Sequence, residues 1–179
     1  MHNLTSRANA LFAFTLTALA SVTFAAFMTT VFADMGANVE LASSNVLVKH
    51  MPDYHTTKSK ADLASMNFDI TVDTTPLWNW NVKELFLYLV AEYATKKNAV
   101  NQVVLWDRIM LRDGQPTVTI HEANPKYYFW DDGSNLKGHE NVTLTLYWNV
   151  IPNAGYLPLV KGRGSHQVKM PNSYTASRI

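Results

Sequence analysis

NVTLTLYWNV, residues 141–150, is the stretch that decides the fold. Apolar and polar residues alternate along it, and a period of two is typical of a strand with one face in a core. The residues expected to face the core are Val142, Leu144, Leu146, Trp148 and Val150. Those expected to face outward are Thr143, Thr145, Tyr147 and Asn149. The stretch therefore predicts a half-buried strand.

The same alternation extends to other parts of the chain. MNFDITVD, residues 66–73, repeats it. LFLYLVA, residues 85–91, is apolar without alternation, which fits a strand covered on both sides or a short buried helix; its aromatic residues favour the strand. We also expect strands at residues 39–48, 100–106, 109–111, 117–121, 126–130, 157–160 and 166–170.

Polar residues, Pro and Gly separate these apolar runs. Residues 51–65 are polar and unpatterned, which predicts a surface loop. Many short strands at this spacing indicate an antiparallel β-sandwich. The chain is thus predicted to be mainly β, with one domain over residues 34–179.

Composition excludes several classes of site. The chain has no Cys, so it has no disulfide, no thiolate metal site and no Cys nucleophile. Its net charge is +1 and 16% of its residues are charged, which gives no basic surface for nucleic acid. An enzyme and a binding domain both remain compatible with this composition.

The amino-terminal part contains an uncharged run at residues 11–33. As a helix this run would measure about 35 Å, against a hydrocarbon core of about 30 Å. A cleavable signal peptide usually has an apolar core of only roughly 7 to 15 residues. Val31 and Ala33 nevertheless occupy the small-residue positions of a cleavage site. We predict a retained membrane anchor, with cleavage after Ala33 as the alternative.

The charges beside this run indicate its orientation. Arg7 precedes it, whereas Asp34 and Glu40 follow it and Lys49 is the first basic residue beyond. The positive-inside rule then places the amino terminus in the cytosol. The predicted organisation is a cytosolic segment at residues 1–10, a signal anchor at 11–33 and a lumenal domain at 34–179, which is a single-pass type II topology.

Two sequons for N-glycosylation occur. Asn141 precedes Val142 and Thr143, and its strand parity places it on the polar face, where a glycan has room. Asn3 also begins a sequon, but on the predicted topology it never enters the lumen. We expect a glycan at Asn141 alone.

A lumenal hydrolase would need a Ser nucleophile with a His or Lys base. The candidate hydroxyls lie in the polar stretches 43–45 and 133–135, which lack a strand-to-helix elbow or a helical Ser-x-x-Lys pattern. The histidines that could serve as the base are scattered along the sequence, at His50, His55, His121, His139 and His166. No catalytic residue is predicted.

Metal and cofactor sites are not predicted either. Residues 131–135, DDGSN, resemble part of a calcium loop but lack the later Glu that would complete it, so we interpret them as a turn. The pairs His121–Glu122 and His139–Glu140 lack the helical spacing of a zinc site. We expect no bound metal or cofactor.

PLWNWN, residues 76–81, places Trp78 and Trp80 on one strand parity beside a Pro. An indole combines an apolar body with one hydrogen-bond donor, so the pair is a candidate membrane-interface or partner contact. Core packing is the competing interpretation.

Four stretches together resemble the family of signal peptidase complex subunit 3. They are SRANALFAFTLTALA (6–20), FDITVD (68–73), WNVKELFLYLVAEYATKKNAVNQVVLWDRI (80–109) and DDGSNLKGHENVTLTLYWNVIPNAGYLPLV (131–160). The resemblance covers nearly the whole chain in the same order and is weakest at residues 51–65 and after Gly162.

This resemblance implies a function. The family comprises glycosylated accessory subunits of the endoplasmic reticulum enzyme that removes signal peptides, with catalysis by a separate subunit that carries a Ser and a His. It implies a non-catalytic protein whose partners are the catalytic and other subunits, with membrane lipid around residues 11–33 and the translocation channel as a further candidate partner. Docking is expected away from the polar face of the glycosylated strand.

Two alternatives from other classes remain open at this point. A secreted or anchored β-sandwich that binds carbohydrate or mediates adhesion would share the fold, and the secreted form would be cut after Ala33. A lumenal hydrolase would need an activity that depends on a single Ser.

Overall fold

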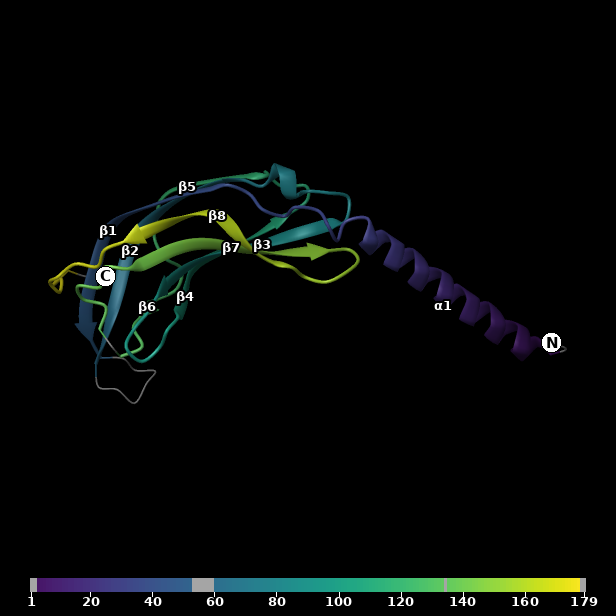
Figure 1. The fold of residues 1–179 in the computed structure, drawn as a ribbon, viewed down its shortest axis with the longest axis horizontal. Helices are drawn as coiled ribbons and strands as arrows, with labels where there is room; N and C mark the ends of the chain where they lie inside the picture. The colour runs from purple at the N-terminus through teal and green to yellow at the C-terminus, as the bar shows by residue number, and fades with distance from the viewer. Residues whose placement is uncertain (1–2, 53–59, 134, 178–179) are drawn as a thin grey trace.

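A computed structural model describes residues 3–52, 60–133 and 135–177. One helix, α1 (Leu4–Met28), projects from one end of a curved β domain (Figure 1). The strands that follow are β1 (Val39–Met51), β2 (Ala61–Asp73), β3 (Val82–Tyr93), β4 (Asn101–Leu111), β5 (Thr117–Ala123), β6 (Phe129–Trp130), β7 (Val142–Pro152) and β8 (Leu159–Val168). A short 3-10 helix, η1 (Thr75–Leu77), precedes β3.

Helix α1 is long and apolar enough to cross a membrane, and none of its residues is buried against the domain. Asn3 caps its amino end by accepting a hydrogen bond from the backbone N–H of Ser6 at 2.8 Å. The hydroxyls of Thr15, Thr17 and Ser21 donate to carbonyls one turn earlier. A hydroxyl bonded in this way exposes no unpaired donor to lipid, so these residues are compatible with a membrane span.

The strands form two antiparallel sheets, as the alternation predicted. One has the order β1-β2-β5, with β6 also paired to β2, and the other has the order β4-β3-β7-β8. The core lies between them and includes every predicted inward residue of β7. Residues 85–91 lie within the central strand β3, so the strand interpretation is confirmed.

The sandwich closes where β8 passes beside the start of β1. The backbone N–H of Arg163 donates to the carbonyl of Ala37 at 2.9 Å. Gly164 has a φ of 148°, and a Cβ there would lie 2.1 Å from the carbonyl oxygen of Val39. Glycine is therefore required at this crossing, because a side chain would separate the two strands.

Three boundaries drawn from the sequence are wrong. Residues 157–160 and 166–170 were expected as separate strands, but the intervening glycines continue a single strand, β8. Residues 101–106 and 109–111 likewise belong to one strand, β4, and Val100 lies just before it. Only Phe129 and Trp130 of the strand expected at 126–130 pair with β2, because the N–H groups of Lys126 and Tyr127 donate to Leu105 instead.

The bounds of the loop expected at residues 51–65 are also wrong. Met51 ends β1, and Ala61 begins β2. The start of β2 was missed because Asp62 is a charged residue at a core position. Its carboxylate is fully buried and accepts hydrogen bonds from the backbone N–H groups of Leu136 and Lys137. Burial of this carboxylate depends on partners from a loop more than seventy residues away, which local alternation does not reveal.

Candidate functional site

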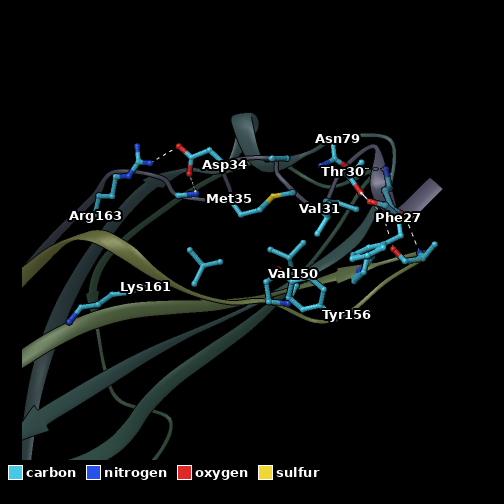
Figure 2. Close-up of a pocket in the computed structure, with 18 residues that line it drawn as sticks. Phe27, Thr30, Val31, Asp34, Met35, Asn79, Val150, Tyr156, Lys161 and Arg163 are labelled. Carbon is cyan, nitrogen blue, oxygen red and sulfur yellow. Dashed lines mark hydrogen bonds and ion pairs between the residues drawn. The ribbon is translucent and has the colours of Figure 1, made fainter. Parts of the chain in front are cut away.

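The end of α1 is attached to the β7–β8 loop and to the start of β3 (Figure 2). Phe27 lies edge-on to Tyr156 with 6.0 Å between ring centroids. The amide of Asn81 donates to the hydroxyl of Thr30 at 2.9 Å. Gly155 has a φ of 119°, and a Cβ there would lie 2.6 Å from the ring of Phe27. These contacts set the direction in which the helix leaves the domain.

Asn81 is the central residue of this junction. Its side chain is 2% exposed and also bonds both backbone groups of Ala154, donating to the carbonyl at 2.8 Å and accepting from the N–H at 2.9 Å. A buried amide with all of these partners holds three chain segments in one arrangement.

A cavity of about 410 Å³ lies beside the junction, between residues 31–36 and the β7–β8 hairpin. Its lining includes Val31, Met35, Val150 and Tyr156, and Asp34 and Arg163 form an ion pair at its edge with 2.5 Å between Nη2 and Oδ2 (Figure 2). The backbone N–H of Gly36, followed by the guanidinium of Arg163, lowers the pKa of Asp34. The ion pair connects the segment after the helix to β8.

The outer faces of the two sheets differ in chemistry. On β2 and β5, the outward residues are polar, namely Asn67, Asp69, Thr71, Asp73, Thr117 and Thr119. On the opposite sheet, Phe86, Tyr88 and Tyr147 form a row of aromatic rings, with 5.6 Å between the first two centroids and 5.9 Å between the last two. Ile109 lies opposite Phe86 on β4 and is 60% exposed. We call these four residues the aromatic face.

The aromatic face ends in a polar network on its β8 side. Tyr147 donates to Glu92 at 2.8 Å, and Lys161 lies 3.7 Å from the same carboxylate. Burial, then the hydrogen bond to Glu92, raises the pKa of Tyr147 to about 12. Burial acts to raise the pKa of Glu92, but hydrogen bonds from Gln102 and Tyr147 and the charge of Lys161 lower it overall. At neutral pH the network therefore pairs an ionised carboxylate with a neutral phenol.

A groove of about 480 Å³ crosses the aromatic face, lined by Phe86, Tyr88, Val104, Asp107, Tyr127 and Asn149. Asp107 is held at its edge by Lys126 and Tyr127, with oxygen contacts at 3.3 and 2.8 Å. Half-buried aromatic rings together with the exposed Val104 and Tyr127 around a shallow groove, bordered by charges, are typical of a surface that binds another protein.

Asn141 is exposed immediately before β7, as expected for a glycosylation acceptor. It precedes Tyr147 by six residues along an extended chain, or roughly 20 Å at about 3.4 Å per residue. The sequon and the aromatic face therefore share one side of the domain but lie at different ends of it. Whether the site carries a glycan stays a prediction.

The prediction that Trp78 and Trp80 lie on the same face of a strand is wrong. They follow η1 in a turn, because Pro76 lies within that 3-10 helix. Trp78 is partly buried against the core and donates its indole N–H to the hydroxyl of Thr74 at 3.1 Å. Trp80 is 58% exposed. Only Trp80 of the pair thus offers most of its surface to a neighbour.

The structure brings together Ser43 and His166, both among the candidates considered for a hydrolase. The hydroxyl of Ser43 lies 3.0 Å from Nε2 of His166, joining β1 to β8. His50 lies elsewhere, with its Nδ1 2.7 Å from Asp62. A hydrolytic triad needs nucleophile, base and orienting acid in one continuous hydrogen-bonded set. Here the Ser–His and His–Asp contacts belong to different histidines.

The remaining candidates occupy separate positions. Asp131 accepts a hydrogen bond from the backbone N–H of Asn135 at 2.7 Å, which supports the turn interpretation. His121 and Glu140 are exposed, and His139 contacts the carbonyl of Ala94 at 2.9 Å. His55 lies outside the described residues. Among the residues that the structure describes, no three His, Asp or Glu side chains are grouped to hold a metal ion.

Comparison with known proteins gives a consistent result over almost the full chain. Residues 1–173 match the family described as signal peptidase subunit. Signal peptidase complex subunit 3 of Homo sapiens and of Gallus gallus are each 49% identical to this chain over 178 residues, which cover 99% of both sequences. The subunit of the same name from Drosophila melanogaster is 49% identical over 179 residues, the whole of each sequence.

Proposed function

The chain belongs to the signal peptidase subunit family, and from this membership we propose its role as an accessory subunit of the signal peptidase complex, supporting removal of signal peptides from nascent secretory and membrane proteins. The observation that carries the proposal is near-half identity along essentially the entire chain. A carbohydrate-binding or adhesion module is not favoured, because it would account for the β-sandwich fold but not for the sequence identity to signal peptidase complex subunit 3.

Helix α1 fits this role as a signal anchor in the endoplasmic reticulum membrane. We propose that the amino terminus is cytosolic and the sandwich lumenal, on the charge argument from Arg7 and Asp34. The anchor escapes cleavage after Ala33, in this proposal, because α1 spans the bilayer as far as Met28 and Asn81 holds Thr30 against the domain, which leaves no free extended segment for a protease active site. Membrane lipid contacts residues 11–33, and the translocation channel is a further proposed neighbour.

We further propose that the aromatic face binds the catalytic subunit or another subunit of the complex. It combines three half-buried aromatic rings and the exposed side chain of Ile109 with a groove, whereas the outer surface of β2 and β5 is polar. This proposal departs from the expectation that docking avoids the polar face of the glycosylated strand, because Tyr147 lies on that face. Only the end near Asn141, where a glycan would obstruct a partner, is left outside the proposed contact.

A single N-linked glycan at Asn141 is part of the same proposal. Digestion of the microsomal protein with endoglycosidase H should give one mobility shift. Asn141→Gln should abolish that shift, because the exposed acceptor is lost, and Asn3→Gln should leave it unchanged, because Asn3 caps the cytosolic end of α1. A shift that survives Asn141→Gln would contradict either the site or the topology.

The subunit itself performs no catalysis in this proposal; the family resemblance assigns the serine-type chemistry to another chain. Ser43 provides the sharpest test, because it has a His within hydrogen-bond distance. Ser43→Ala in the complete complex should leave the rate of preprotein processing unchanged, with His166→Ala as the matched second variant. Processing that falls to background in both variants, with subunit levels intact, would show that this chain is catalytic.

A further inference from the structure

We propose that the sandwich rests on the bilayer through a ring of exposed apolar side chains around the end of α1, so that the domain contacts the lipid interface directly as well as through its anchor. The ring consists of Phe32, Trp80, Tyr156 and Leu157. These side chains contact the boundary between the phospholipid headgroups and the acyl chains.

The contacts at the junction place the ring at the same level as the end of α1. Tyr156 packs against Phe27, and Phe27 lies within the last turn of α1. Asn81, the neighbour of Trp80, is bonded to Thr30 just beyond that turn. A plane drawn across the helix end therefore passes through both loops. If α1 spans the bilayer, these loops must lie at the membrane surface, because the junction holds them level with its end.

The side chains of the ring are largely exposed to water in the isolated chain. Phe32 is 90% exposed, Trp80 58% and Leu157 59%. Large apolar side chains gathered from three separate segments are unfavourable in water and favour transfer to an apolar environment. Trp and Tyr are also the residues enriched where a protein crosses the headgroup region, since their rings have an apolar body and a polar edge.

The loops around the helix end carry no charge of their own. Residues 29–33, 74–82 and 150–160 contain no charged residue. The guanidinium of Arg112 reaches these loops and donates to the carbonyls of Asn79 and Val82, and Asp34 and Arg163 form an ion pair beside them. An Arg at this level is compatible with the headgroup region, because its long side chain can keep the charge on the polar side of the interface.

The consequence is a second attachment to the membrane. A single helix lets a domain tilt about the point where it leaves the bilayer. A ring that enters the interface beside that point restricts tilt, and the buried hydrogen bonds of Asn81 transmit the restriction to the sheet that contains β3, β7 and β8. The height of the aromatic face above the membrane is then constant.

The natural absence of Cys makes the test direct, because single-Cys variants need no other change. The full chain would be reconstituted in phosphatidylcholine nanodiscs with a nitroxide at Trp80→Cys or Leu157→Cys. Val100→Cys is the control, since Val100 is 68% exposed but follows the far end of β3. We expect collisions with oxygen to exceed those with water-soluble nickel chelate at positions 80 and 157, and the reverse at position 100.

A second measurement avoids labels. Brominated phosphatidylcholine should quench more tryptophan fluorescence in the unmodified chain than in Trp80→Phe, which keeps an apolar ring. Collision ratios at positions 80 and 157 equal to that at position 100 would overturn the proposal, as would quenching unaffected by Trp80→Phe. Protection found only in the assembled complex would assign the ring to another subunit and also overturn it. The nanodisc measurements involve no other subunit, so they are independent of the proposed role in signal peptidase.

Discussion

Cells depleted of this protein and supplied with residues 1–40 alone should fail to process preproteins, whereas the full chain should restore processing and the level of the catalytic subunit. The truncated chain keeps α1 but ends at the start of β1, so both sheets are absent. If the domain holds the catalytic subunit in its working geometry, its loss should be severe, because a misplacement of about 1 Å can cost on the order of a hundredfold in rate.

The matched control for this experiment is the full chain carrying Asn141→Gln. It lacks the proposed glycan but keeps the sandwich, and it should rescue as well as the unmodified chain. Membrane insertion of the 1–40 protein must be checked by alkaline extraction, so that failure to rescue is not failure to insert. Complete rescue by the inserted 1–40 protein would show that the sandwich domain is dispensable.

The second large effect is expected at the aromatic face. Phe86→Arg should remove the protein from the complex, as judged by co-purification of the other subunits from detergent-solubilised microsomes. An aromatic residue at the centre of an interface typically contributes about 2 kcal/mol or more, which corresponds to roughly 30-fold weaker binding. A buried, unpaired guanidinium would weaken association further.

Folding and binding must be separated in this experiment. Ile109→Arg changes the same face at a position that is 60% exposed, so it should weaken co-purification with little change in thermal stability. Thr119→Arg adds the same charge to the polar outer surface of β5 and should leave the complex intact. Equal recovery of the subunits with all three variants would exclude the aromatic face as the docking surface.

Local patterns were sufficient where a residue's environment follows from its immediate neighbours. The alternation in residues 66–73 and 141–150 predicted which side chains face the core, because successive residues of a strand point to opposite sides. Patterns failed where a distant segment supplies the partner. Asp62 can be buried in a strand because the backbone N–H of Leu136 donates a hydrogen bond to its carboxylate. Gly164 lies within β8 and does not end it, because the backbone of Val39 passes too close to leave room for a side chain.

The candidate site shows the same division. Exposure of Asn141 followed from its parity, whereas the split between Trp78 and Trp80 did not, since η1 replaces the strand that parity assumed. The aromatic face could have been suspected from Phe86, Tyr88 and Tyr147, which lie at outward positions of their strands. Pairing of β3 with β7 was needed to bring their rings together.

The sequence by itself determined the apolar helix and the β-sandwich class, because each depends on composition and short-range order along the chain. It also indicated the family, through resemblance over nearly the whole chain. Only the tertiary structure decided which sheet carries an apolar outer face and how α1 is attached to the domain. The attachment joins Phe27 to Tyr156 and Thr30 to Asn81, contacts between residues far apart in the chain. Such contacts arise from the order in which strands pair, and alternation within one strand carries no information about its neighbours.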